Sequence, residues 1–207
     1  MKNIVSIEEY LKNPCQASSI PYWKAKVIPI PNTIVILHQN EFHEQYDNYQ
    51  RYFRLLHTLN DLKPILDDTE TIGRTEELLD LLNVCFEKEN IELSLEDLCS
   101  MQSHPTFHKS LWVGIRAEAK LIACGIGEFD KECREGILEW ICVLPQAQRE
   151  GYGSTIVSVL LHRLKKLGAL FVTVSGRVDN ISNPEKFYRS CGFKGTDIWY
   201  ICNKKET

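Results

Sequence analysis

The chain has 207 residues, of which 43% are hydrophobic and 25% are charged, and its formal net charge is −4. These values are typical of a soluble globular protein that can bury a sizeable core, with one domain and an elaboration as the simplest organisation. The acidic balance argues against nucleic acid as the main partner, because phosphate backbones need a basic footprint on the protein.

The N-terminal part of the chain differs from the rest by its irregular sequence. Four prolines interrupt the first 31 residues, and the clearest strand pattern before residue 50 is T-I-V-I-L at residues 33–37. No low-complexity linker separates this part from the remainder of the chain. We therefore predict that residues 1–50 are an extension packed on a main domain at residues 51–207.

The main domain begins with a strand and two helices. Residues 52–59 have the alternation of a strand, and Thr75 is expected to cap a helix with one apolar stripe. Ser94, with Asp97 three residues later, resembles a capping box for a second helix. That helix should end before Pro105, since proline disfavours helical backbone in the residue before it.

Three strand-like runs come next, at residues 111–115, 121–127 and 137–143, with a hairpin turn near residues 118–120. Residues 156–167 then carry an apolar helical stripe, and Gly168 suits the position after the helix end. The strand pattern at residues 169–175 completes a parallel β-α-β unit with a right-handed crossover.

A last helix is predicted between Asn183, as its N-cap, and Gly192, with Pro184 as its first residue. A final strand is expected at residues 198–202. The order of elements predicts an α/β (α+β) fold in which helices pack on a mixed sheet.

The segment Q-R-E-G-Y-G-S at residues 148–154 precedes the clearest helix. Its two glycines leave backbone N–H groups bare at a helix start, where the dipole favours an anion. A P-loop would need a lysine here, and a dinucleotide fingerprint would need glycine in place of Ile156. The alternatives are therefore an anion site of another kind or a tight turn without a ligand.

Two motifs resemble those of a known family. The segment I-L-E-W-I-C-V-L-P-Q-A-Q-R-E-G-Y-G-S resembles the acetyl-CoA-binding motif of the GNAT superfamily of N-acetyltransferases, a strand followed by V-x-P and (Q/R)-x-x-G-x-(G/A). Downstream, N-P-E-K-F-Y-R-S-C-G-F resembles the family's (L/F)-Y-x-x-x-G-F motif. The resemblance covers residues 52–207 and implies a GNAT-like mixed, splayed sheet flanked by helices, with an irregular N-terminal extension.

The resemblance implies that the loop anion is the pyrophosphate of acetyl-CoA, the co-substrate. Backbone N–H groups would cradle it, glycine would allow its close approach, and the Glu150 side chain should point to solvent. A solvated role for Arg149 and helix capping by Ser154 stay open as alternatives. The implied loop residues are Gln148, Arg149, Glu150, Gly151, Tyr152, Gly153 and Ser154.

The strand before the loop and the segment before the last helix complete the implied cofactor site. The backbone of Ile141, Cys142 and Val143 would pair with the pantetheine arm, and an N–H near Val143 would polarise the thioester carbonyl. The family's asparagine lies seven residues before its tyrosine, where Ile181 stands here. Its neighbours Asn180 and Asn183 are the candidates, although Asn183 is also explained as a helix cap.

Two residues are candidates for catalysis. Tyr188 matches the family's tyrosine that protonates the departing thiolate, with simple packing as the alternative. Glu139 lies in the strand before the loop and could take a proton from the amine, unless it is a surface carboxylate. An acyl intermediate on Cys142 is a weaker alternative, because no histidine lies near it in sequence.

The implied reaction moves an acetyl group from acetyl-CoA to a primary amine by direct attack in a ternary complex. The acceptor, a small molecule or a peptide, has no readable code in the sequence. The alternatives are a non-catalytic acyl-CoA-binding module with a protein partner, and a plain structural domain. A homodimer is possible.

Cysteine spacing and the N-terminus bear on metals and on location. The eight cysteines include no Cys-x-x-Cys pair, and neither they nor the six histidines have zinc-ligand spacing. We expect no metal and a reducing cytoplasm. The first residues lack the apolar core of a signal peptide, and charges interrupt every long apolar run, so we expect no membrane association.

Overall fold

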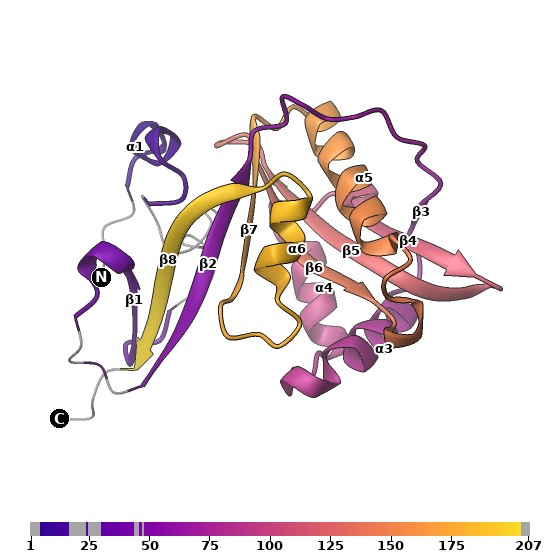
Figure 1. The fold of residues 1–207 in the computed structure, drawn as a ribbon, viewed down its shortest axis with the longest axis horizontal. Helices are drawn as coiled ribbons and strands as arrows, with labels where there is room; N and C mark the ends of the chain where they lie inside the picture. Colours follow the sequence, from indigo (N-terminus) through magenta and orange to yellow (C-terminus); the bar gives the residue numbers. More distant parts are fainter. Residues whose placement is uncertain (1–4, 17–23, 25–29, 44–45, 47, 204–207) are drawn as a thin grey trace. The chain divides into compact units, whose positions relative to one another are not determined.

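The computed structural model describes residues 5–16, 24, 30–43, 46 and 48–203 (Figure 1). Its contacts divide the chain into two compact units. The terminal unit comprises residues 1–57 and 173–207, and the central unit comprises residues 58–172. The domain division near residue 50 that the sequence suggests stays a prediction.

The central unit contains four antiparallel strands. Their order is β6 (Glu135–Val143), β5 (Lys120–Asp130), β4 (Trp112–Ala117) and the short β3 (Glu70–Thr71). The predicted hairpin turn between β4 and β5 is confirmed. Glu118 and Ala119 have φ angles of 48° and 67°, as a tight turn that matches the strand twist requires.

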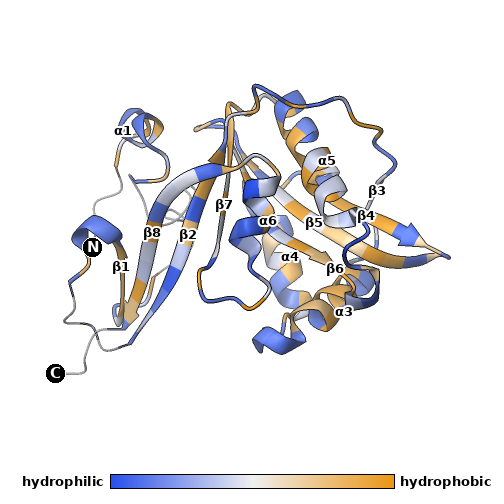
Figure 2. Ribbon diagram, in the orientation of Figure 1, coloured by the Kyte–Doolittle hydropathy of each residue, from blue (hydrophilic) through white to orange (hydrophobic). Residues whose placement is uncertain are grey.

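Helices cover both faces of these strands. Helix α5 (Tyr152–Leu167) packs on β5 and β6, while α3 (Thr75–Phe86) and α4 (Leu95–Ser103) bury their apolar residues with the opposite face of β5 (Figure 1). Figure 2 shows β5 and β6 mostly in hydrophobic colours, as expected for strands buried on both sides. The buried residues of α5 are Ile156, Val157, Val159, Leu160, Leu161 and Leu164.

The helix ends of the central unit test the capping predictions. The capping box of α4 is confirmed, because Ser94 and Asp97 exchange side-chain bonds with each other's backbone N–H, and α4 ends at Ser103, before Pro105. The prediction for α3 is wrong: Arg74 is its N-cap, without a side-chain bond. Thr75 is already helical, so its hydroxyl cannot reach the next N–H groups and instead accepts a bond from Gln102.

Short 3-10 turns connect the remaining elements of the central unit: η2 (Glu87–Glu89), η3 (Lys109–Leu111) and η4 (Pro145–Ala147). Leu111, which the sequence places in a strand, lies in η3 and not in β4. Because three residues form one 3-10 turn, such short elements carry no periodic signal in the sequence.

The terminal unit has its own strands and helices. Strand β8 (Lys194–Asn203) lies between β1 (Ile34–His38) and β2 (Tyr49–His57) and is antiparallel to both, and β7 (Phe171–Arg177) follows β2 in the sheet. Helix α6 (Pro184–Ser190) starts at its predicted N-cap, Asn183, and Gly192 follows its end. The six-residue α1 (Ile7–Lys12) and the turn η1 (Gln39–Glu41) were not predicted.

Candidate active site

The glycine loop links β6 to α5 in the central unit. After η4, Arg149 and Gly151 have left-handed backbone, with φ angles of 70° and 90°, and Gly151 is the N-cap of α5. A Cβ at Gly151 would meet no atom within 4 Å. Glycine is therefore favoured here because L-residues with side chains rarely adopt this φ. The space beside Gly151 is open.

The start of α5 presents backbone donors. The first helical bond joins the N–H of Thr155 to the carbonyl of Gly151 at 3.0 Å, so the N–H groups of residues 152–154 precede the ladder. No side chain caps this end. Tyr152 and Gly153 are half-buried and Ser154 is exposed. Bare N–H groups at the positive end of a helix dipole form an anion-binding site.

The polar side chains of the loop bond within the loop itself. The Gln148 amide donates to the carbonyl of Val143 at 3.2 Å, and the Ser154 hydroxyl donates to the carbonyl of Gly151 at 2.7 Å. Ser154 thus donates to a carbonyl and is not a helix cap. Arg149 and Glu150 are exposed. The backbone is therefore the main source of donors in this arrangement.

Strand β6 carries a bulge that the sequence analysis missed. Ile126 of β5 faces Trp140 and the next residue, Gly127, faces Leu138, so Glu139 is the additional residue of β6. Bulges bend a strand and redirect its side chains, and no glycine in this part of β6 signals one. Glu139 is half-buried. Beyond the bulge, residues 141–143 continue in register with β5 and lead into the loop.

Cys142 has the surroundings of a structural thiol. It is buried, and its Sγ lies 3.4 Å from the Sγ of Cys124 on the neighbouring strand. The hydrogen bond with Cys124, together with burial, raises the pKa of Cys142 well above its ordinary value. Since the thiolate is the nucleophilic form, this environment disfavours the acyl-cysteine alternative.

The remaining predicted site residues lie in the terminal unit. Tyr188 is buried on α6 among the rings of Phe53, Phe187 and Phe193, with centroid distances of 5.1–6.4 Å. The Asn183 side chain accepts the N–H of Lys186, so its role as a helix cap is confirmed. Asn180 accepts bonds from the backbone and hydroxyl of Ser182 in a local turn.

The comparison with known families agrees with the motifs. Residues 108–195 match the acetyltransferase (GNAT) domain family. The glycine loop and Tyr188 lie inside this matched segment. No curated protein matches the sequence of the chain.

Several solved structures have the same fold as this chain. A GCN5-related N-acetyltransferase from Sphaerobacter thermophilus is 13% identical with a TM-score of 0.65, over 77% of this chain and 52% of that one. The chain thus spans about half the length of that protein. The ribosomal-protein-S18-alanine N-acetyltransferase from Escherichia coli is 17% identical with a TM-score of 0.53, over 67% and 94%.

A third similar structure is a putative GNAT-family acetyltransferase from Novosphingobium aromaticivorans, 10% identical with a TM-score of 0.59, over 86% of this chain and 71% of that one. At these identities the likeness concerns the fold. Within the described residues, no cluster of three or more His, Cys, Asp or Glu side chains is placed to hold a metal ion. The helices described there also lack the length and apolarity to span a bilayer.

A strap of residues 58–69 beside α5 is a further feature of the central unit that the sequence analysis missed. Arg163 of α5 fixes it by donating to both carboxylate oxygens of Asp67 at 3.0 and 3.1 Å and to the hydroxyl of Thr69. A cavity of about 290 Å³ between strap and helix reaches Ser154 at the glycine loop. The strap has no periodic pattern, so nothing in its sequence signals this contact.

Proposed function

We propose that the protein is an N-acetyltransferase that moves an acetyl group from acetyl-CoA to a primary amine by direct attack in a ternary complex. The observation that supports this most is the start of α5, where bare N–H groups follow a left-handed Gly151 with open space beside it. This start lies inside the segment that matches the GNAT domain. The acceptor we propose is a small-molecule or peptide amine.

The backbone of the central unit would bind the donor. The N–H groups of residues 152–154 would hold the pyrophosphate, because they are unused by the helix and stand at its positive end. Residues 141–143 of β6 would pair with the pantetheine amides. An N–H near Val143 would stabilise the negative charge that develops on the carbonyl oxygen during attack.

Proton transfer would fall to side chains. An alkylamine has a pKa of about 10.4, so it must lose a proton before it attacks, and half-buried Glu139 at the bulge of β6 is our candidate base. Because a thiol has a pKa of about 8.5, modest assistance suffices for the departing thiolate. We propose Tyr188 for this role, with the surrounding rings fixing its position.

The test uses the purified full chain with acetyl-CoA and a panel of primary amines and short peptides. CoA and acetylated amine are separated by chromatography and identified by mass, because exposed Cys99 would react with thiol reagents. The test variant is Gly153→Val, which adds bulk to the first turn of α5. Its matched control is Gly73→Val, since Gly73 has no atom within 4 Å of an added Cβ.

We expect the wild-type chain to acetylate at least one amine. It should bind CoA at least about tenfold more tightly than Gly153→Val, because the variant would lose one or more charge-assisted hydrogen bonds to the pyrophosphate. Gly73→Val should behave as wild type. CoA binding without any acetylated product would favour the non-catalytic acyl-CoA-binding module. If the wild-type chain bound no CoA, the proposal would be wrong.

A further inference from the structure

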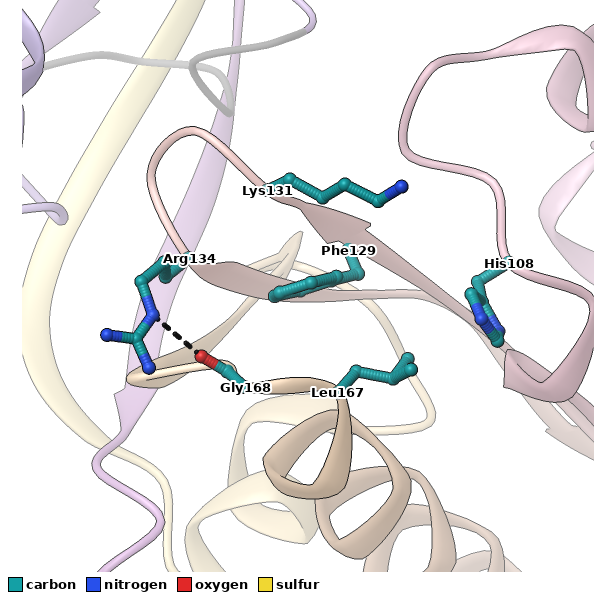
Figure 3. Close-up of a pocket in the computed structure, with 6 residues that line it drawn as sticks. All are labelled: His108, Phe129, Lys131, Arg134, Leu167 and Gly168. Atoms are coloured by element: carbon teal, nitrogen blue, oxygen red, sulfur yellow. Dashed lines mark hydrogen bonds between the residues drawn. The ribbon is translucent and has the colours of Figure 1, made fainter.

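A second cavity of the central unit lies at the C-terminal end of α5, beside the turn that joins β5 to β6. Its volume is about 550 Å³, within the range of small-molecule sites. Its lining consists of His108, Phe129, Lys131, Arg134, Leu167 and Gly168 (Figure 3). No acidic side chain belongs to this lining.

The basic groups of the cavity are available to a ligand. Arg134 donates one hydrogen bond, from Nε to the carbonyl of Gly168 at 2.9 Å. Its two terminal nitrogens remain as donors for a ligand. Among the described residues, Lys131 makes no ion pair or hydrogen bond. His108 accepts the N–H of Ser110 on Nδ1 at 3.3 Å, so in the neutral ring Nε2 carries the proton.

Two other arginines of the central unit, unlike Arg134, have carboxylate partners. Arg163 is bound to Asp67, and Arg116 is bound to Glu70 and Glu77. The buried carboxylates next to this turn, Asp130 and Glu135, are paired across β5 and β6. Both therefore lie on the face of the strands opposite Phe129. One oxygen of Asp130 accepts the N–H of Glu132 at 2.9 Å. Within the part of the chain that the structure describes, Lys131 and Arg134 thus have no carboxylate partner.

The middle of the cavity is apolar. Figure 3 shows the Phe129 ring between Lys131 and Leu167, with Arg134 and His108 at opposite ends. The negative end of the α5 dipole would repel an anion, but several carbonyl groups at this end already accept hydrogen bonds. The N–H of Gly168 bonds to the carbonyls of Leu164 and Lys165, and Arg134 covers the carbonyl of Gly168.

We propose that this cavity binds a phosphate monoester carried on a flat apolar body, an aryl or heterocyclic ring. Two permanent positive charges and an imidazole match a doubly charged phosphate better than a singly charged carboxylate, and the arginine fork suits phosphate geometry. Phe129 and Leu167 supply the apolar surface for the ring. Neither the basic nor the apolar residues of this cavity take part in the proposed acetyl transfer.

The cavity is separate from the glycine loop. The two lie at opposite ends of α5, whose 16 residues correspond to about 24 Å at 1.5 Å per residue. A ligand at each end can therefore be bound at the same time. The inference goes beyond the proposed function and does not depend on it.

The test titrates the full chain with phenyl phosphate, inorganic phosphate and benzoate by calorimetry, with and without saturating CoA. Amide chemical shifts of residues 131–134 report whether binding is local. The test variants are Lys131→Gln/Arg134→Gln and Lys131→Glu. The second keeps the test valid if loss of the Arg134 bond to Gly168 weakens the fold. The control Lys88→Gln/Lys120→Gln removes the same charge at exposed sites outside the cavity.

We expect phenyl phosphate to bind most tightly, to shift the amides of residues 131–134 and to keep its affinity when CoA is present. Both test variants should weaken it by about tenfold or more, the loss of one charge-assisted hydrogen bond, and the control should not. Absent binding, equal affinity in wild type and Lys131→Glu, or displacement by CoA would overturn the site. Equal affinity for benzoate or inorganic phosphate would overturn the ligand class.

Discussion

The two ends of α5 place the same residue in the same backbone conformation and put it to opposite uses. Gly151 precedes the helix with φ 90° and Gly168 follows it with φ 100°. At the start, no side chain caps the helix and its N–H groups stay available. At the end, the N–H of Gly168 returns to the carbonyls of Leu164 and Lys165, and Arg134 takes the carbonyl of Gly168.

The difference teaches that a left-handed glycine does not by itself make a binding site. We propose an anion at both ends of α5. The start would attract it with backbone N–H groups and the helix dipole, whereas the end would need side chains to overcome the dipole. The start should therefore tolerate changes of charge and respond to changes of shape. The end should respond to changes of charge.

The largest effect should come from disturbing the packing of α5 on β5, on which both ends of the helix depend. An added Cβ at Gly125 of β5 would come within 2.3 Å of Ile156 and 2.9 Å of Leu160, two buried residues of α5. We expect Gly125→Ala to lower the free energy of unfolding by about 1–3 kcal/mol, as overpacking does. Urea denaturation followed by circular dichroism measures this loss.

Gly127→Ala is the matched control on the same strand, because an added Cβ there meets its nearest atom, on Leu160, only at 3.3 Å. It should lose clearly less stability than Gly125→Ala. Equal losses for the two variants would mean that the close approach of α5 to β5 at Gly125 is not what fixes the helix.

Much of this arrangement is predictable from local sequence. The glycine loop, the stop of α5 at Gly168 and the Ser94 capping box depend on residues a few positions apart, so their signals lie within one short segment. The bulge at Glu139 depends on pairing with β5, and the strap depends on Arg163 meeting Asp67 across 96 residues. Such contacts leave no periodic trace in the chain.

The capping prediction for Thr75 failed for a related reason. Threonine is a favoured N-cap, yet the helix begins at Thr75 itself, and Arg74 takes the extended cap conformation. Two glutamates in the first turn complement the helix dipole in place of a side-chain cap. A propensity is a local preference, and it does not by itself fix the residue at which a helix starts.

A smaller effect is expected from substitutions that compare Gly151 and Gly168 directly. Because left-handed backbone costs an L-residue roughly 1–2 kcal/mol, Gly151→Ala and Gly168→Ala should each lose about that much unfolding free energy. Neither added Cβ meets an atom closer than 3.9 Å, so strain from contacts does not complicate the pair. Only Gly151→Ala should also weaken CoA binding in calorimetry. If Gly168→Ala weakened CoA binding equally, the two ends would not act independently.

The smallest effect concerns the strap, which runs beside α5 from Leu59, held by Lys165, to Asp67, held by Arg163. Burial by itself raises the pKa of Asp67. The hydrogen bonds from Thr69 and Arg163 and the charge of Arg163 outweigh burial, so the pKa of Asp67 lies below its ordinary value. A lowered carboxyl pKa stabilises the fold above the unfolded pKa of about 3.9. That contribution disappears as pH falls through the lower folded pKa.

Asp67→Asn should therefore cost about 0.2–1 kcal/mol of unfolding free energy at pH 7, the range of partly exposed ion pairs. The gap between variant and wild type should shrink as the pH is lowered from 5 to below 3.9, as urea denaturation at each pH would show. Asp68→Asn removes the same charge from an exposed neighbour and should leave stability nearly unchanged. A gap that stayed constant down to pH 3 would show that the hydrogen bonds of the side chain, and not its charge, hold the strap to α5.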